Sequence, residues 1–187
     1  MPDLAEILRA SLGTPVADPV LPEGAPAAVL VPVVLEPEPT VLFTRRTETV
    51  RQHKGEVSFP GGSRHDDDPD LLTTALRETE EEVGIPREAV EVLGGLPPTQ
   101  TFVTGYVIAP YVGLLHVRPE MVASPVEIAE VLEARIDVLL EIEREVPSPG
   151  GPHPMMFTYD LENVTVWGAT GRILHDLLEV LRKGGWR

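Results

Sequence analysis

The pattern of hydrophobic and polar positions divides the chain into helical and extended segments. In some segments apolar residues recur every three to four positions, which is the period of a helix with one buried face. In others, apolar and β-branched residues form short runs between turns rich in Gly, Pro, Asn or Asp, which predicts strands. We predict helices over residues 3–12, 71–83 and 170–183, and strands over residues 27–35, 40–45, 90–96, 106–115, 155–159 and 164–167.

Residues 124–142 allow two interpretations. Ser124, Pro125 and Glu127 have the spacing of a helix start with a capping box. The apolar residues that follow also fit the alternation of a strand. These residues are Ile128, Leu132, Ala134 and Ile136. The sequence leaves both interpretations open.

Strands interrupted by a few helices predict an α/β (α+β) fold with a mixed sheet covered on both faces. A length of 187 residues suits one domain with a sizeable core and is too short for two. We therefore expect a single domain over residues 1–187. Within it, residues 1–26 are expected to form an N-terminal helix, capped by Asp3, and a proline-rich extended connector.

The most informative segment is ALRETEEEVGI, residues 75–85. One helical stripe is expected to face the core, and it consists of Leu72, Leu76, Thr79 and Val83. The neighbouring row begins with Leu71 and Ala75 and continues to Glu78 and Glu82. Two carboxylates one turn apart are therefore predicted at the edge of the buried face, where their repulsion grows as water is removed.

A bound divalent cation would remove this repulsion. Glu81 lies near enough to join through water, and Arg77 can pair with a neighbouring carboxylate and fix its rotamer. The alternative is that a run of Glu on a helix is ordinarily a solvated face. The preceding FPGG turn and the following Gly84 favour a metal site, because glycines let a backbone carbonyl and a phosphate approach the same point.

Composition narrows the chemistry further. The absence of cysteine removes disulfides, thiolate zinc sites and Cys nucleophiles, so any metal must be held by oxygen or imidazole. Fifteen basic against thirty acidic residues give a net charge of -15, which repels nucleic acid and anionic membranes. We see no secretory signal and no membrane-spanning run, and expect a cytoplasmic protein with neither nucleic acid nor membrane as a partner.

Residues 75–85 resemble the second half of the Nudix box, the pattern R-E-U-x-E-E-x-G-U in which U is apolar. The matching positions are Arg77, Glu78, Glu81, Glu82, Gly84 and Ile85, whereas Thr79 replaces the first apolar residue. The segment before it matches the first half of the Nudix box less well. Arg77 follows Gly62 by fifteen residues rather than fourteen, and the early acidic position falls somewhere in residues 65–68.

Residues 42–62, LFTRRTETVRQHKGEVSFPGG, resemble the signature of the coenzyme A pyrophosphatase subgroup of Nudix hydrolases. The matching positions are Thr44, Arg46, Arg51, Gly55, Phe59, Pro60, Gly61 and Gly62, whereas Phe43 and Thr47 depart from it. The additional residue before Arg77 also resembles this subgroup. The likeness extends from about Val41 to Leu174, through LPPTQTFVTGYVIAPYVGLL and VWGATGRIL.

This resemblance implies an α/β/α sandwich with a Nudix box region over residues 62–85. It implies hydrolysis of coenzyme A, or a close derivative, to 3′,5′-ADP and 4′-phosphopantetheine with Mg²⁺ or Mn²⁺. Glu78 and Glu82 are the first-choice metal ligands, followed by Glu81 and the Gly62 carbonyl. Arg77 is expected to be one of the catalytic residues.

Two carboxylates compete as the general base. Glu81 is close to the metal ligands, and Glu127 lies where Nudix proteins often place a distal acidic group, unless it belongs to the capping box. Arg46 and Arg51, with the Gly61 backbone, are the candidate phosphate-binding groups. For any single Arg, a surface ion pair is the alternative.

Several residues are expected to be structural: Phe59, Trp167 and residues 155–157 in packing, and His53 in an exposed loop. Three rival functions stay open. They are hydrolysis of another nucleoside diphosphate compound such as ADP-ribose or NADH, a non-catalytic nucleotide-binding or regulatory module, and a structural cation site. The preference for free or acylated coenzyme A and a possible homodimer are also undecided.

Overall fold

The computed structural model describes residues 3–47, 55–101, 105–148 and 155–186. Its main sheet has the order β3-β2-β1-β7-β5, with β4 beside β1, β6 beside β7 and β8 beside β2. β1 and β7 are parallel and the other pairs are antiparallel, so the sheet is mixed as predicted. Its strands are β1 (Ala25–Val34), β2 (Thr40–Arg46), β3 (Val57–Ser58), β4 (Gly61–Ser63), β5 (Glu91–Gly95), β6 (Thr99–Gln100), β7 (Tyr106–Leu115) and β8 (Ile128–Arg135).

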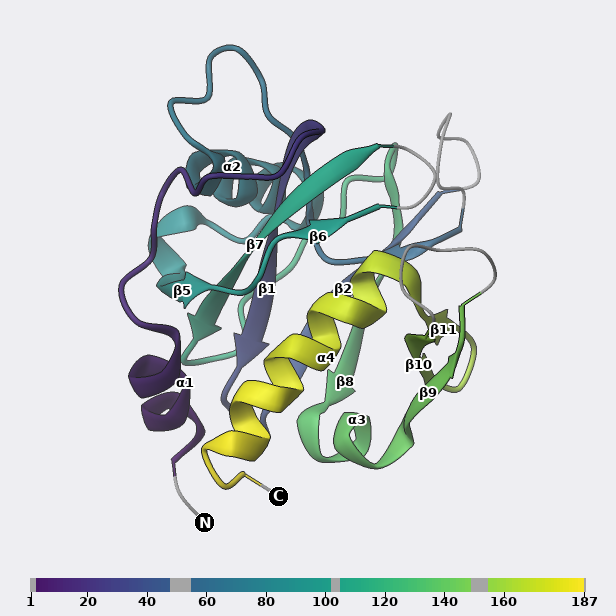
Figure 1. Cartoon of the computed structure of the whole chain (residues 1–187). Helices are drawn as coiled ribbons and strands as arrows, with labels where there is room; N and C mark the ends of the chain where they lie inside the picture. The colour runs from purple at the N-terminus through teal and green to yellow at the C-terminus, as the bar shows by residue number, and fades with distance from the viewer. Residues whose placement is uncertain (1–2, 48–54, 102–104, 149–154, 187) are drawn as a thin grey trace.

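Helices cover both faces of this sheet because successive residues of a strand point to opposite sides. Val31 and Val33 of β1 belong to the core cluster under α1 and α4, whereas Ala28 and Leu30 pack with α2. Figure 1 shows α4 lying across one face of the sheet, with α1 beside its C-terminal end. The helices are α1 (Leu4–Leu12), α2 (Leu71–Val83), the 3₁₀ turn η1 (Arg87–Ala89), α3 (Ile136–Ile142) and α4 (Gly168–Lys183).

Residues 124–142 contain a strand followed by a helix. β8 occupies Ile128–Arg135 and pairs with β2, and α3 follows it directly. Ser124 starts only a turn, in which its carbonyl accepts from the N–H groups of Glu127 and Ile128. Of the two interpretations left open, the strand is therefore correct for residues 128–135, because pairing with β2 satisfies the backbone of these residues in the extended form.

The buried stripe of α2 is rotated from the predicted one. Leu71 and Ala75 are buried, whereas Leu72 and Leu76 are only partly buried. The small Ala75 side chain lets this face lie against β1 and β4, the two strands with which α2 makes most of its contacts. As a result Glu82, expected at the edge of the buried face, is 3% exposed.

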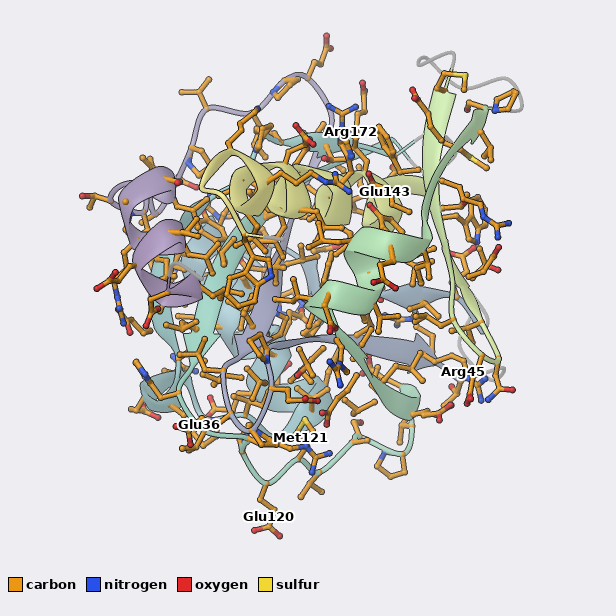
Figure 2. The ribbon with its side chains drawn as sticks, turned by 90° about the horizontal axis from the view of Figure 1, so that it is seen from below. Glu36, Arg45, Glu120, Met121, Glu143 and Arg172 are labelled. Carbon is orange, nitrogen blue, oxygen red and sulfur yellow. The ribbon has the colours of Figure 1, made fainter. Side chains whose placement is uncertain are left out.

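A second sheet extends the fold on the α4 side. Its order is β11-β10-β9, with β9 at Glu143–Pro147, β10 at Met155–Asp160 and β11 at Thr165–Val166. Glu143 accepts from the Tyr159 hydroxyl, contacts His175 Nδ1 at 3.2 Å and lies 2.9 Å from Arg182 Nη2. Figure 2 shows Glu143 beside α4, with Met121 on the opposite side of the sheet. This shared carboxylate ties β9 and β10 to α4.

None of the helices among the described residues combines the length and the apolar character needed to cross a membrane.

Two expectations about packing differ in outcome. Phe59 is 2% exposed and stacks on Phe43 with ring centroids 4.9 Å apart, as expected for a core residue. Trp167 and Met155 are 51% and 37% exposed, so the packing prediction is wrong for these two side chains.

Candidate active site

The candidate site forms where α2 meets the glycine bend of β4. The Asp70 side chain caps the start of α2 by accepting from Thr73 N at 2.7 Å. Gly84 ends the helix in the left-handed conformation, with φ 73°, and its N–H bonds to the Glu80 carbonyl. β4 pairs with β1, which also packs against α2. The bend at Gly61 and Gly62 is thereby held against the carboxylate face of the helix.

Glu82 is the most buried carboxylate of this site. It accepts from the Gly61 N–H at 3.2 Å, and its Oε1 lies 3.4 Å from Arg46 Nη1. Burial is the main cause that raises the pKa of Glu82 to about 7, and the negative charges of Glu78 and Glu127 raise it further. The Gly61 and Arg46 contacts oppose this shift without cancelling it. A positive charge beside Glu82 would lower this pKa and favour the ionised carboxylate.

Glu78 lies against the backbone of Gly62. A Cβ atom added at Gly62 would stand 2.7 Å from the Glu78 Cδ atom, so only glycine lets the strand approach this carboxylate so closely. Burial raises the pKa of Glu78, while the positive charge of Arg77 lowers it less. Glu78 and Glu82, predicted one turn apart on one face, both face the β4 bend.

Arg77 is held by Asp68, the acidic residue that the sequence placed only within residues 65–68. Arg77 Nε and Nη2 donate to the two Asp68 oxygens at 3.0 and 2.9 Å. Asp68 is 7% exposed and also accepts from Thr74 Oγ1 and from the His65 N–H. The Arg77 guanidinium, acting mainly through these hydrogen bonds, holds the pKa of Asp68 far below its usual range.

The third nitrogen of Arg77 reaches the carboxylates of its own helix. Its Nη1 donates to Glu78 at 2.9 Å and to Glu81 at 3.0 Å. Glu81 is the most exposed of the three box carboxylates, with a side chain 60% exposed. Arg77 therefore sets the positions of Glu78 and Glu81, while Asp68 fixes Arg77 from the other side.

Glu127 reaches the same site from the turn before β8. Its carboxylate is 48% exposed and lies 3.6 Å from Arg46 Nη2, so Arg46 stands between Glu82 and Glu127. The capping interpretation of Glu127 is wrong, because no helix begins at Ser124. Arg51 and His53 lie outside the described residues.

The described residues contain no group of three or more His, Asp or Glu side chains arranged to hold a metal ion. In this arrangement arginines contact the carboxylates: Arg77 bonds to Glu78 and Glu81, and Arg46 lies 3.4 Å from Glu82. The donor set nevertheless fits a hard divalent cation, which prefers carboxylate and carbonyl oxygens. The buried Glu82 and the partly buried Glu78, both with raised pKa values and beside a backbone without a Cβ atom, are suited to such an ion.

A family model described as the NUDIX domain matches residues 24–146, which is more than half of the chain. The chain is a member of the Nudix hydrolase family. The match includes β1, the glycine bend, the whole of α2 and Glu127, and thus all the carboxylates of the candidate site. Nudix hydrolases act on diphosphate bonds and generally use divalent metals such as Mg²⁺ or Mn²⁺.

Two bacterial relatives extend the likeness to most of the chain. A protein of Photorhabdus laumondii with the name uncharacterized Nudix hydrolase NudL is 40% identical over 157 residues, which cover 82% of this chain and 83% of the relative. A Cronobacter sakazakii protein with the same name is 43% identical over 154 residues, covering 81% and 80%. This Nudix hydrolase is therefore a pyrophosphatase by family.

Solved structures share its fold at low sequence identity. The NUDIX domain of Shewanella oneidensis NrtR, in complex with ADP ribose, has a TM-score of 0.56 and 15% identity, covering 87% of this chain and 88% of that one. The MutT protein from Methanosarcina mazei Go1 has a TM-score of 0.55 and 17% identity, covering 87% and 96%. The predicted Nudix fold is confirmed.

The metal-free Nudix hydrolase is expected to lose stability as the pH rises from about 4.5 to about 7. Glu82 ionises near its ordinary pKa of 4.5 when unfolded and near about 7 when folded. Between these values the folded state holds more protons, so raising the pH favours unfolding, by roughly 2 to 3 kcal/mol in total. Urea unfolding with a chelator at pH 5 and pH 7.5 measures this loss.

Glu82→Gln is the matched control, because it removes the titrating group while keeping the side-chain size. We expect this variant to lose much less stability between the two pH values than the wild type. Added Mg²⁺ is expected to restore the stability of the wild type at pH 7.5 and to have less effect on the variant. An identical pH dependence in both proteins would show that Glu82 stays ionised in the folded state.

Proposed function

We propose that this Nudix hydrolase cleaves the diphosphate bond of coenzyme A, or a close derivative, to give 3′,5′-ADP and 4′-phosphopantetheine. The observation that carries the proposal is the 42–62 signature, which joins an arginine segment to the FPGG bend. In the folded chain the two ends of this signature meet at one carboxylate. Arg46 and the Gly61 N–H both contact Glu82, at 3.4 and 3.2 Å.

Glu78 and Glu82 would hold the metal ion, with Glu81 joining through water and the Gly62 carbonyl as a further oxygen. When bound, Mg²⁺ or Mn²⁺ neutralises the diphosphate, polarises the attacked phosphorus and lowers the pKa of the attacking water. Arg77 is a positioning residue in this proposal, because it contacts Glu78 and Glu81 and is itself fixed by Asp68. Asp68 is placed to keep that guanidinium in one orientation.

Arg46 and the Gly61 backbone would bind the phosphates. A guanidinium pairs with phosphate oxygens in the same bidentate manner as with carboxylates, so Arg46 can exchange its long contacts to Glu82 and Glu127 for the substrate. Arg51 belongs to the same proposal by its place in the signature. The reacting phosphorus would then lie between the carboxylates of α2 and the end of β2.

Glu127 is favoured over Glu81 as the group that accepts the proton from water. Glu81 is bonded to Arg77 Nη1 at 3.0 Å, so this donor already occupies one of its carboxylate oxygens. Glu127 is half-exposed, and within the part of the chain that the structure describes its carboxylate makes the longer 3.6 Å contact to Arg46, the residue proposed to bind the substrate's phosphates. Release of Arg46 toward phosphate would leave Glu127 free to accept a proton.

One assay tests the substrate. The protein is incubated with coenzyme A, ADP-ribose and NADH in parallel, with Mg²⁺ or Mn²⁺, and the products are identified by mass. We expect coenzyme A to be converted to 3′,5′-ADP and 4′-phosphopantetheine with the highest kcat/KM of the three. Hydrolysis of ADP-ribose or NADH alone would contradict coenzyme A as the substrate but not the hydrolase activity. Binding of all three compounds without turnover would indicate a non-catalytic module.

A further inference from the structure

A cavity of about 450 Å³ opens at the end of the sheet beside the candidate active site. The end of β2 and the start of β3 form one wall, through Arg45, Arg46 and Val57. The turn between β10 and β11 and the residue that precedes α4 form the other wall, through Asn163 and Trp167. The two walls lie next to each other because β11 contacts β3, and Figure 2 shows Arg45 at the edge of the molecule.

Arg46 connects this cavity to the catalytic carboxylates. It lines the cavity, and its guanidinium also lies 3.4 Å from Glu82 and 3.6 Å from Glu127. A diphosphate bound to Arg46 would therefore have one of its substituents next to the cavity. The volume lies within the range of sites that hold a small organic group, roughly 300 to 1,000 Å³.

Trp167 presents a large flat side chain to this space. The chain has only nine aromatic residues among Phe, Tyr and Trp, and Trp167 is 51% exposed, an unusual position for an indole without a partner surface. Its backbone is fixed on both sides. Val166 before it is completely buried, and Thr170 after it donates to the Val57 carbonyl at 3.2 Å. The backbone that carries the indole is therefore held in place before a ligand arrives, which lowers the entropic cost of stacking.

We infer that this cavity binds the nucleoside base of the substrate, which stacks on the indole of Trp167. This rests on the proposed function, because the base must be linked to a diphosphate held at Arg46. A planar base gains dispersion and π-stacking from an indole, whereas a flexible pantetheine chain has no flat face to offer it. Asn163 lines the same cavity, and its amide can match the donors and acceptors of a base. Thr165 also lines it; its hydroxyl donates to Asp160 at 2.8 Å and can still accept from a base.

Kinetics of Trp167→Ala and Trp167→Phe test the subsite. Base stacking contributes about 5- to 100-fold in affinity at an aromatic side chain, so the Ala variant should raise KM for coenzyme A by a factor in this range with a much smaller change in kcat. The Phe variant should recover most of the loss, because it restores a stacking surface. Val138→Ala, a smaller truncation at another exposed apolar residue, on α3, should leave both constants as in the wild type.

A merely structural role for Trp167 would lower the activity on every substrate alike. We therefore compare coenzyme A with a base-free diphosphate diester, and expect the loss in kcat/KM for the Ala variant to be at least five-fold larger for coenzyme A. Equal losses on the two substrates, or an unchanged KM in both variants, would overturn the subsite. Absence of turnover in the wild type would instead overturn the proposed function.

Binding is measured separately from turnover by indole fluorescence. The chain has two tryptophans, and Trp186 packs against the core cluster under α1 and α4, so Trp186→Phe leaves Trp167 as the sole reporter. Circular dichroism and coenzyme A turnover close to wild type show that this variant is folded. We expect saturable quenching by 3′,5′-ADP and none by inorganic pyrophosphate. Quenching by 4′-phosphopantetheine instead would assign the cavity to the other half of the substrate and overturn the base subsite.

Discussion

Replacing Glu82 with Gln is expected to reduce kcat on coenzyme A by roughly 1,000-fold or more while the protein stays folded. Glu82 is proposed as a metal ligand, and metal ions contribute several kcal/mol to the stabilisation of charge in the transition state. The amide keeps the size of the side chain and can still accept from the Gly61 N–H. Steady-state kinetics at saturating Mg²⁺, with circular dichroism to check folding, measures the effect.

Glu80→Gln is the matched control for this prediction. Glu80 lies on the same helix, faces away from the site and pairs with Arg87 at 3.0 Å on the surface. Its loss should change kcat by less than about two-fold, since exposed ion pairs contribute little. A Glu82→Gln protein that kept more than a tenth of the wild-type kcat would contradict the metal site, whatever its stability.

Asp68→Asn is expected to lower both the stability and the activity of the enzyme. The substitution removes the negative charge that faces Arg77 across two hydrogen bonds in a buried position. Loss of one partner of such a pair costs about 3 kcal/mol or more in the free energy of unfolding. Arg77 would also position Glu78 and Glu81 less well, and a supporting residue of this kind typically affects metal affinity or activity 10- to 100-fold.

Urea unfolding and the Mg²⁺ dependence of kcat measure the two effects of Asp68→Asn. The control is Asp67→Asn, because Asp67 is the preceding residue, has the same side chain and is exposed. It should change neither quantity noticeably. If the two variants behaved alike, Asp68 would not be the acidic residue that supports the box, and another residue in the 65–68 segment would have to take that role.

The match between sequence and structure is best where local rules decide the conformation. α2 spans its predicted residues 71–83 and ends at Gly84 as predicted, and β7 has its predicted bounds. The cap and the left-handed glycine act within one turn of the chain, so they can be identified without knowledge of the fold. The same holds for the spacing of Glu78 and Glu82, because the helical period alone puts them on one face.

Prediction was less successful where distant segments compete for the same residues. Residues 128–135 had the pattern of either element, and pairing with β2, more than eighty residues away in sequence, decided for a strand. The rotation of α2 that buries Glu82 depends on how closely β1 and β4 approach Ala75. Trp167 was expected to pack in the core, yet the structure leaves it 51% exposed.

By itself the sequence determined the family, the carboxylate helix, the glycine bend and the arginine signature, because each is a short segment whose spacing follows from local backbone geometry. Only the tertiary structure decided that Asp68 is the residue that holds Arg77, that Arg46 lies between Glu82 and Glu127, and that Trp167 lines a cavity beside them. These contacts join segments from four elements. Their energies come from burial and charge, which depend on what the fold brings together and not on distance along the chain.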